Sequence, residues 1–565
     1  MFVVFEGIDG SGKTTVSSRV AKRLREAGLS VEHLREGGKF SSSVTQAIRE
    51  FGRDARNLEL TPVAEFMLFV TRDVQLLEER TRPALGQAQI VIADRFLYSA
   101  ENLARYGRGL PEELVRPVLL AAANGLQPDL VILVDVDPHL ARARRQAEKR
   151  ATLVKRPPSR KGLAGVGLQH RMSAGYAALA AAEPERWLIV DNDGELEANV
   201  ERVVELLRTA QQRGVPAALA SFRAAAPARR PLPSALPSVA AALEAFLSWL
   251  DARALREPAV AAYFLSGLHG AEVDERRIAL GERVPEALLT ASIGLDDAVS
   301  WSLREQLAER FPDATARSLA GLPAAHARAA ALRARLRQRA PLAVLSSYDT
   351  LDDDEAYQLR EVLYAEHPAL VIGSLNRLDD ARAWALRERF VRERGEGVFA
   401  DYEQARLICK SVAWLDGERA WELRKAARET APVAAIGSIS GIMDSDRAWK
   451  WRLRWADRAS KTVFGTLRHN QDERGWPLRT RLAPMVKEAI DSIQDLDHAT
   501  AWQLREQHAD LWPSTVLKSL GPLCSGERGE KLIKRQLARH PGNVSLLKHA
   551  SAIALGLHSA AGASD

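Results

Sequence analysis

The chain has 565 residues, which is too many for one hydrophobic core and predicts roughly three or four domain equivalents. Its 46% hydrophobic and 27% charged residues exclude a disordered protein, and a net charge of +6 over this length does not by itself indicate nucleic-acid binding. Two cysteines exclude a disulfide framework and no apolar run reaches the length of a membrane span, so the sequence predicts a cytoplasmic protein.

Short apolar runs alternate with amphipathic stretches over residues 1–210. The runs 2–5, 90–93 and 130–134 are rich in β-branched residues without polar alternation, which is typical of strands buried on both faces of a parallel sheet. Helical patterns lie between them, as at 62–85. This series predicts an α/β domain with a parallel sheet and helices on both faces.

The stretch GIDGSGKT, from Gly7 to Thr14, fits the pattern G-x-x-x-x-G-K-[ST]. It follows an apolar run and opens a helical pattern, which favours a phosphate-binding loop over a glycine-rich turn with a chance lysine. Lys13 is expected to reach the β- and γ-phosphates of ATP, and the Thr14 hydroxyl to bind Mg²⁺. The predicted ATP-binding residues are Gly7, Asp9, Gly10, Ser11, Gly12, Lys13, Thr14 and Thr15.

Charged residues follow two later strands. Asp94 and Arg95 end the run IVIADR, at the carboxyl end of a strand where such sheets place their ligand groups. A carboxylate there can hold Mg²⁺ or its waters and an arginine can pair with a phosphate, while the alternative is an ordinary salt bridge. Asp135 and Asp137 end the next run and are interpreted as structural or capping residues.

The pattern changes after residue 210. A Pro-, Ala- and Arg-rich stretch, 211–239, is interpreted as a linker, and a repeat region over 240–555 and a tail at 556–565 follow it. Segments of the type LDDARAWALRE recur there at steps of 26 to 29 residues, with one step of 37. The anchoring aromatic residues are Trp301, Tyr357, Trp384, Trp421, Trp449, Trp476 and Trp502, with a degenerate unit near Leu332 and Arg333.

Each repeat is predicted to be a two-helix hairpin. An aspartate five residues before the aromatic stands where a helix N-cap is wanted, and a later proline suits the first turn of the second helix. A hairpin of this size cannot bury its apolar face alone, so the pattern predicts an all-α solenoid of short, HEAT-like two-helix repeats. The predicted caps are Asp296, Asp352, Asp379, Asp416, Asp444 and Asp497. The prolines are Pro258, Pro285, Pro312, Pro341, Pro368, Pro432 and Pro513.

An arginine recurs three residues after each aromatic. Such a stripe could bind a nucleic-acid backbone, but the recurring acids cancel its field, which favours a ladder of arginines paired with carboxylates of the adjacent repeat. The tryptophans are interpreted as packing between repeats, and a protein is the expected partner of the solenoid, with nucleic acid less favoured. The arginines are Arg304, Arg360, Arg387, Arg424, Arg452, Arg479 and Arg505.

Residues 1–208 resemble the thymidylate kinase family. The shared motifs, in family order and spacing, are FVVFEGIDGSGKTT, REGG at 35–38, AEFMLFVTRD at 64–73, RPAL at 82–85, IADRFLYSA and LVDVDP at 133–138. The resemblance implies a P-loop nucleoside-monophosphate kinase that transfers the γ-phosphoryl group of Mg-ATP to dTMP, giving dTDP. A homodimer through this domain is a further expectation.

The resemblance also assigns site residues. It gives ATP and Mg²⁺ to Lys13 and Thr14, and the metal or its waters to Asp94. Because the phosphate loop holds no arginine, it implies that a basic lid assists transfer, with a solvated basic loop as the alternative. The lid candidates are Arg150, Arg156 and Arg160. The predicted catalytic residues are Lys13, Asp94, Arg95, Arg150 and Arg156. The predicted acceptor-binding residues are Asp9 for the sugar, Arg35 and Arg95 for the phosphate, and Phe69 and Arg72 for the base.

Base recognition departs from the family pattern. The arginine expected four residues after Phe69 is replaced by Asp73, and Arg72 stands one place earlier, about 100° around a helix. Two alternatives therefore stay open beside a dTMP kinase. One is a kinase of another nucleoside monophosphate, and the other is a nucleotide-binding sensor whose solenoid binds a protein partner.

Overall fold

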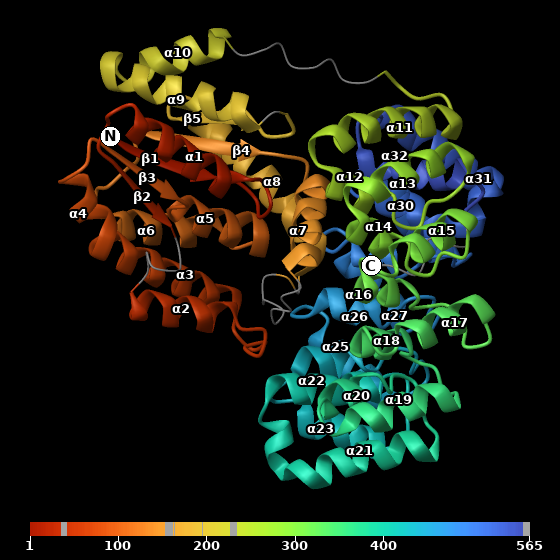
Figure 1. The fold of residues 1–565 in the computed structure, drawn as a ribbon. Helices are drawn as coiled ribbons and strands as arrows, with labels where there is room; N and C mark the ends of the chain where they lie inside the picture. The colour runs from red at the N-terminus through yellow and green to blue at the C-terminus, as the bar shows by residue number, and fades with distance from the viewer. Residues whose placement is uncertain (36–41, 153–161, 163, 195, 226–233, 558–565) are drawn as a thin grey trace. The chain divides into compact units, whose positions relative to one another are not determined.

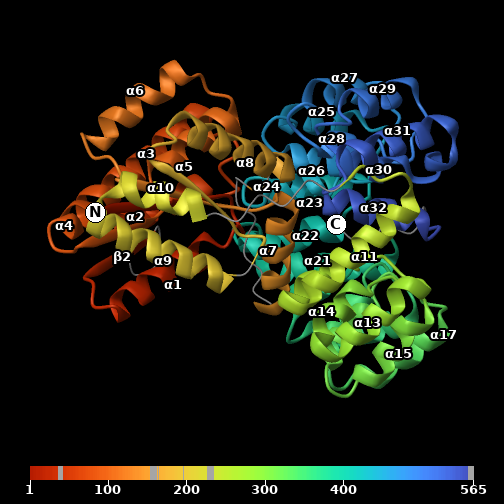
Figure 2. The same cartoon turned by 90° about the horizontal axis from the view of Figure 1, so that it is seen from above.

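The structure is a computed structural model that describes residues 1–35, 42–152, 162, 164–194, 196–225 and 234–557. Figures 1 and 2 show two compact units: one, built around a sheet, comprises Met1–Arg145 and Pro157–Pro231, and the other, which is helical, comprises Gln146–Arg156 and Leu232–Asp565. Among the described residues, no helix is both long and apolar enough to cross a lipid bilayer.

Five parallel strands form the core of the first unit, in the order β2-β3-β1-β4-β5. The predicted strands are confirmed as β1 (Phe2–Glu6), β3 (Ile90–Asp94) and β4 (Leu130–Asp135), whose residues are almost entirely buried. The edge strands β2 (Val31–Arg35) and β5 (Trp187–Asp191) mix buried and exposed positions. Strand β2, with the sequence VEHLR, holds no uninterrupted apolar run, whereas β5, with WLIVD, does hold one and was predictable by the same rule.

The strand register brings polar strand ends to one edge of the sheet. Arg35 lies opposite Asp94, and Asp135 lies opposite Asp191. Glu6 ends the central strand between them. Parallel strands share their carboxyl edge, so this edge carries the groups from which a ligand site can be built.

Helices cover both faces of this sheet (Figures 1 and 2). The core between the sheet and α1 and α9 is continuous, and α3, α5 and α6 enclose a separate apolar cluster. The helices, in chain order, are α1 (Lys13–Glu26), α2 (Ser43–Arg53), α3 (Pro62–Leu76), α4 (Arg82–Leu85), α5 (Leu97–Asn102), α6 (Glu112–Ala123), α7 (Pro138–Thr152), α8 (Gly165–Ala182), α9 (Leu196–Arg213) and α10 (Val215–Ala225), with π-helical turns at Leu77–Thr81 and Leu103–Gly107.

The segment 211–239 is not a linker throughout, which corrects the sequence interpretation. Its first part is α10, and Ala218 and Phe222 on this helix are buried in the core beside α9. The guanidinium of Arg202 lies 4.4 Å over the Phe222 ring. The alanine-rich composition of this segment, which was interpreted as a linker, also suits a closely packed helix, because alanine has the highest helix propensity.

The second unit is an array of helix pairs, as the repeat pattern predicted. Each predicted proline begins the second helix of its pair. The array closes, because α11 packs against α32 (Figures 1 and 2). The first helices of the pairs are α11 (Val239–Arg256), α13 (Ala271–Arg283), α15 (Ala298–Leu307), α17 (Ala327–Leu336), α19 (Asp354–Tyr364), α21 (Ala381–Arg394), α23 (Glu418–Ala427), α25 (Asp446–Trp455), α27 (Gly475–Leu482), α29 (Ala499–Gln507) and α31 (Glu527–Arg539). The second helices are α12 (Pro258–Phe264), α14 (Pro285–Ala291), α16 (Pro312–Ser318), α18 (Pro341–Ser347), α20 (Pro368–Gly373), α22 (Tyr402–Ser411), α24 (Pro432–Gly437), α26 (Ser460–Gly465), α28 (Glu488–Asp491), α30 (Pro513–Leu520) and α32 (Val544–Ala554).

The predicted N-caps are wrong by one residue. In α21 the cap is Asp380, which accepts from the backbone N–H groups of Arg382 and Ala383 at 2.9 and 3.1 Å. Asp379, the predicted cap, instead accepts from the Trp384 indole at 2.7 Å. The same shift by one residue holds at all six predicted caps, because the capping residues are Asp297, Asp353, Asp380, Gly417, Ser445 and His498.

The recurring arginines are buried as a ladder requires, but their partners are not carboxylates. Within the described parts of the chain, they donate to backbone carbonyls and to a hydroxyl. Arg505 shows the arrangement: Nε donates to Ser519 Oγ at 3.0 Å, and the other nitrogens donate to the carbonyls of Leu496, Ile493 and Ser519 at 2.8 to 3.0 Å. These carbonyls lie at the ends of α28 and α30, where they have no helical partner. The arginine therefore joins two adjacent repeats by capping both.

Burial has a measurable electrostatic consequence at Arg505. Loss of hydration lowers its pKa to about 10, which still leaves the guanidinium protonated at neutral pH. A carboxylate ladder between repeats does exist, but exposed arginines form it. Arg382 pairs with Asp354 at 2.8 Å, and Arg528 pairs with Glu506 at 2.7 Å. These pairs are exposed, so solvent screens them and each contributes little to stability.

Each anchoring aromatic lies between repeats, as predicted for the tryptophans. Trp502 is buried, with the buried Arg505 guanidinium 5.0 Å from its ring centroid and the exposed Arg528 guanidinium 4.8 Å from it. Trp384 is placed in the same way between Arg387 and Arg419. The rings therefore serve packing and cation–π contacts between neighbouring repeats.

Candidate nucleotide site

The phosphate loop connects β1 to α1 at the carboxyl edge of the sheet. Gly7, Gly10 and Gly12 have positive φ angles of 148°, 91° and 90°. A Cβ at Gly10 would lie 2.3 Å from the carbonyl oxygen of Ala141, and one at Gly12 would lie 2.4 Å from the Asn192 amide nitrogen. Only glycine fits these positions, and α1 begins directly after them, so the loop presents backbone N–H groups at a helix N-terminus.

Lys13, Thr14 and Asp94 come together where the loop enters α1. Lys13 is 7% exposed, and Thr14 Oγ1 donates to Asp94 Oδ2 at 2.5 Å. Asp94 is itself buried at the end of β3. Thr15, the last predicted ATP-binding residue, is exposed in the first turn of α1. The structure thus brings the predicted hydroxyl and carboxylate together, with the buried Lys13 next to Thr14 in the chain.

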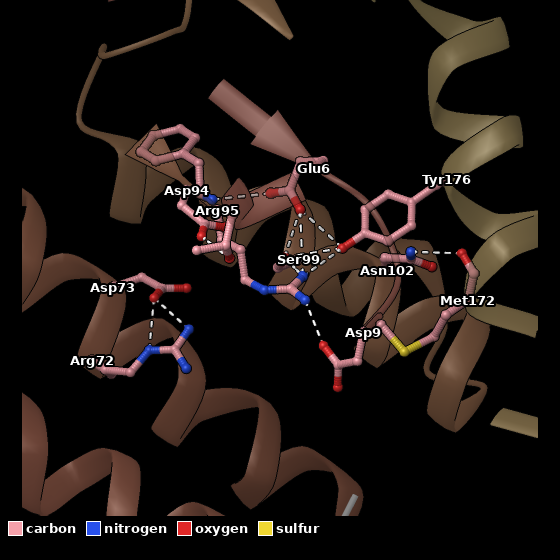
Figure 3. Close-up of polar contacts among 12 residues, drawn as sticks. Glu6, Asp9, Arg72, Asp73, Asp94, Arg95, Ser99, Asn102, Met172 and Tyr176 are labelled. Carbon is pink, nitrogen blue, oxygen red and sulfur yellow. Dashed lines mark hydrogen bonds and ion pairs between the residues drawn. The ribbon is translucent and has the colours of Figure 1, made fainter. Parts of the chain in front are cut away.

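Arg95 is held by a network of acidic and hydroxyl groups, drawn in Figure 3. Its Nη2 donates to Asp9 Oδ1 at 2.6 Å, and its Nη1 donates to Ser99 Oγ at 2.8 Å and to the Tyr176 hydroxyl at 3.2 Å. Its backbone has a φ of 87°, an uncommon conformation for a residue other than glycine. Strain of this kind is typical of sites where a side chain must point in one direction.

Glu6 lies behind Arg95 and is fully buried. Its carboxylate accepts from the Phe96 N–H at 3.0 Å, from Ser99 Oγ at 2.7 Å and from the Tyr176 hydroxyl at 2.9 Å (Figure 3). Burial raises the pKa of Glu6, although Arg95 opposes this. Burial alone would lower the pKa of Arg95, but the surrounding acidic groups raise it above its ordinary value. The guanidinium therefore stays charged in a buried setting.

Arg35 and Arg95 both stand at the carboxyl edge of the sheet, where strands β2 and β3 end. Arg35 Nε lies 3.9 Å from Asp94 Oδ2, and the Arg35 side chain is 46% exposed. Arg95 follows Asp94 directly and is 15% exposed. Of the two arginines predicted to hold an acceptor phosphate, Arg35 thus lies beside the Asp94 carboxylate, and Arg95 directs its guanidinium to Asp9, Ser99 and Tyr176.

Phe69, Arg72 and Asp73 lie together on α3. Arg72 is almost fully buried, donates through Nε and Nη2 to Asp73 Oδ1 at 2.8 and 2.5 Å, and lies 4.7 Å over the Phe69 ring. Figure 3 shows the Arg72–Asp73 pair in the same part of the unit as Asp94 and Arg95. Arg72 is thus engaged by its own helix.

The predicted lid lies outside the described part of the chain. Arg156 and Arg160 are not among the described residues, and the described part of Arg150 is limited to its backbone in α7. At the start of α7, Asp137 accepts from the N–H of His139 at 2.7 Å and from that of Leu140 at 3.3 Å. This confirms Asp137 as a capping residue.

The sequence analysis missed Glu6, Ser99, Tyr176 and Asn192. Glu6 and Asn192 each stand at the carboxyl end of a strand, β1 and β5, so the rule that selected Asp94 could have found them. Tyr176 lies within α8, far from every recognised motif, and only the fold brings it to Arg95.

The fold and this site define the first unit as an α/β nucleotide-binding domain with a phosphate loop. The sequence model of the thymidylate kinase family matches residues 5–203. The chain is 36% identical over 192 residues to a thymidylate kinase of Solidesulfovibrio magneticus, covering 34% of this chain and 90% of the relative. It is 35% identical over 205 residues to a thymidylate kinase of Deinococcus radiodurans, covering 35% and 94%. A crystal structure of thymidylate kinase from Ehrlichia chaffeensis aligns at 24% identity with a TM-score of 0.28, covering 37% of this chain and 98% of that one.

The chain therefore belongs to the thymidylate kinase family, as the motifs predicted, and its first unit is a nucleotide kinase, a phosphotransferase. The family match ends at residue 203 and does not extend to the helical repeats.

Proposed function

We propose that the first unit transfers the γ-phosphoryl group of ATP to a nucleoside monophosphate, with dTMP as acceptor and dTDP as product. One observation supports this most: two phosphate-binding sets meet at Asp94. Thr14 of the phosphate loop donates to this carboxylate and Arg35 lies 3.9 Å from it, while Lys13 and Arg95 are the neighbours in the chain of Thr14 and Asp94. The choice of dTMP rests on relatives that are thymidylate kinases.

The site residues act by placing positive charge beside the reacting phosphates and by holding the acceptor phosphate in position. An oxygen of the acceptor phosphate attacks the γ-phosphorus, and the bond to the β,γ-bridging oxygen breaks, leaving ADP. Lys13 neutralises charge on the β- and γ-phosphates, and Arg95, oriented by Asp9 and Glu6, holds the acceptor phosphate. No covalent enzyme intermediate is needed, because the chemistry depends on positioning.

The donor atoms at the centre of the site fit a magnesium ion. The Thr14 hydroxyl and the Asp94 carboxylate are hard oxygen ligands brought to one point, and Mg²⁺ in kinases is ordinarily held by one or two such groups together with phosphates and water. Thr14 and Asp94 would hold the ion or its waters. When bound, it would supply positive charge to the transferring phosphoryl group.

A different acceptor base is favoured by the Arg72–Asp73 pair. Arg72 is engaged by Asp73 and Phe69, so its guanidinium is not directed to a base. The Asp73 carboxylate accepts hydrogen bonds but cannot donate one. Thymine O4 is also an acceptor, so the two groups cannot form a hydrogen bond with each other. A base with an exocyclic amino group, as in dCMP, would suit this position better.

A double exchange tests which base the site selects. Arg72→Asp combined with Asp73→Arg restores an arginine four residues after Phe69, and we expect it to raise the ratio of kcat/KM for dTMP to that for dCMP by about tenfold or more. The measurement is ADP release with a panel of (deoxy)nucleoside monophosphates. An unchanged ratio would mean that this pair does not select the base.

The proposal includes a homodimer through the first unit. Val44 and Phe51 on α2 and Met67 on α3 are exposed apolar side chains on two helices that pack together. Apolar side chains gathered on adjacent helices commonly mark an interface. We expect light scattering to give a dimer for the wild type and a monomer for Phe51→Asp. Val362→Asp, which changes a still more exposed apolar side chain in the second unit, should leave the dimer intact.

For the second unit we propose a protein partner. The anchoring tryptophans and recurring arginines are buried between repeats, so they offer neither a base-stacking platform nor a cationic stripe for nucleic acid. A nucleotide sensor, the alternative to a kinase, would also bind a protein partner through the second unit. The two hypotheses differ in phosphoryl transfer, because a sensor binds ATP without transferring phosphate to any acceptor.

A further inference from the structure

A buried amide contacts the phosphate loop from outside the loop's own sequence pattern. Asn192 follows β5 and is 5% exposed. Its Nδ2 donates to the carbonyl oxygen of Ser11 at 2.6 Å. A Cβ at Gly12 would lie 2.4 Å from the same nitrogen, so the loop is packed directly against this amide.

The orientation of Asn192 is determined by its neighbours. Its backbone N–H donates to the Asp135 carbonyl at 2.8 Å, and its own carbonyl accepts from Arg144 Nη2 at 3.0 Å. Its Oδ1 lies 3.4 Å from Asn199 Nδ2, which also donates to the Asp191 carbonyl at 2.8 Å. The Ser11 carbonyl can only accept and the Asn199 amide nitrogen can only donate, so the side-chain nitrogen of Asn192 must face the loop.

We propose that Asn192 is a positioning residue for the phosphate loop. A trans peptide group is planar, and its C=O and N–H point in opposite directions. Because Asn192 holds the Ser11 carbonyl, the N–H of Gly12 in the same peptide group points away from Asn192, as an anion-receiving loop requires. The strand end β5 and helix α9, through Asn199, thereby stabilise the binding-competent form of a loop that lies more than 170 residues earlier in the chain.

This inference rests on the proposed function only in that the loop binds ATP. Two substitutions separate hydrogen bonding from packing. Asn192→Ala removes the amide, whereas Asn192→Asp keeps its shape but places an acceptor against the Ser11 carbonyl. We expect the Kd for Mg-ATP, measured by calorimetry on the full chain, to rise about tenfold in Asn192→Ala and further in Asn192→Asp. Asn199→Ala, which removes the neighbour that orients Asn192, should raise this Kd about threefold.

A matched control is Asn57→Ala, which removes an amide-to-carbonyl bond to Phe51 outside the site and should leave the Kd unchanged. If Asn192 acted only by packing, the isosteric aspartate would replace it without loss. Wild-type affinity for Mg-ATP in Asn192→Asp would therefore overturn the inference. If the wild type binds ATP without transfer and the variants bind it weakly, the kinase proposal fails and the inference stands. If the wild type binds no ATP, both fail.

Discussion

Replacing Lys13 with alanine is expected to lower kcat/KM for phosphoryl transfer by about 10³-fold or more. Lys13 begins α1 directly after Gly12 and is buried at the mouth of the phosphate loop. Its ammonium is the charged group of the loop, and a fixed charge aimed at developing negative charge is worth orders of magnitude in rate. The measurement is steady-state transfer from Mg-ATP, with circular dichroism to show that the variant is folded.

The same helix provides the control for this prediction. Lys22 on α1 is 75% exposed and lies 3.7 Å from Glu26, so Lys22→Ala removes the same charge without touching the loop. Its kcat/KM should stay within about twofold of the wild type. Equal losses in the two variants would show that net charge, rather than the position of Lys13, controls the rate.

The second large effect is expected in the repeat array. Arg505→Met removes the donor of the buried Leu496 carbonyl and one of the two donors of the Ile493 and Ser519 carbonyls, which also accept from the backbone N–H groups of Leu496 and Asp495. Hydrogen bonds from a charged group contribute about 1.5–3 kcal/mol each and their losses are only partly additive, so we expect the free energy of unfolding to fall by about 3–5 kcal/mol. Urea unfolding followed by tryptophan fluorescence measures this, because every tryptophan except Trp187 lies after residue 240.

Arg528→Met is the matched control. Arg528 contacts the same Trp502 ring, but it is 50% exposed and its partner is the exposed Glu506. The variant should lose less than about 1 kcal/mol. A loss as large as that of Arg505→Met would contradict the account in which buried helix-end capping, rather than cation–π stacking, joins the repeats.

The donor side of the site was predictable from the sequence because its chemistry is local. The glycines, Lys13 and Thr14 lie in one short stretch, and Asp94 stands at a strand end where parallel sheets place ligand groups. The partners of Arg95 were not predictable in this way. Tyr176 lies within α8, and only the fold brings this helix to Arg95.

In the repeats, too, local features were predicted and contacts between distant residues were not. The prolines at the start of second helices were predicted correctly, since the requirement is confined to one residue and its helix. The capping residue was misplaced by one position, because the indole of Trp384 competes for the first aspartate. The partners of the arginines were wrong because helix-end carbonyls carry no sequence signal, whereas carboxylates are visible in the sequence.

The central claim is that the first unit is an active nucleoside-monophosphate kinase. Incubating the full chain with Mg-ATP labelled in the γ-phosphate and separating the nucleotides tests it most directly. The account predicts label in a nucleoside diphosphate formed from dTMP or another monophosphate, dependent on Mg²⁺ and lost in Lys13→Ala. Tight ATP binding with no label in any diphosphate, across the whole set of monophosphates, would contradict it.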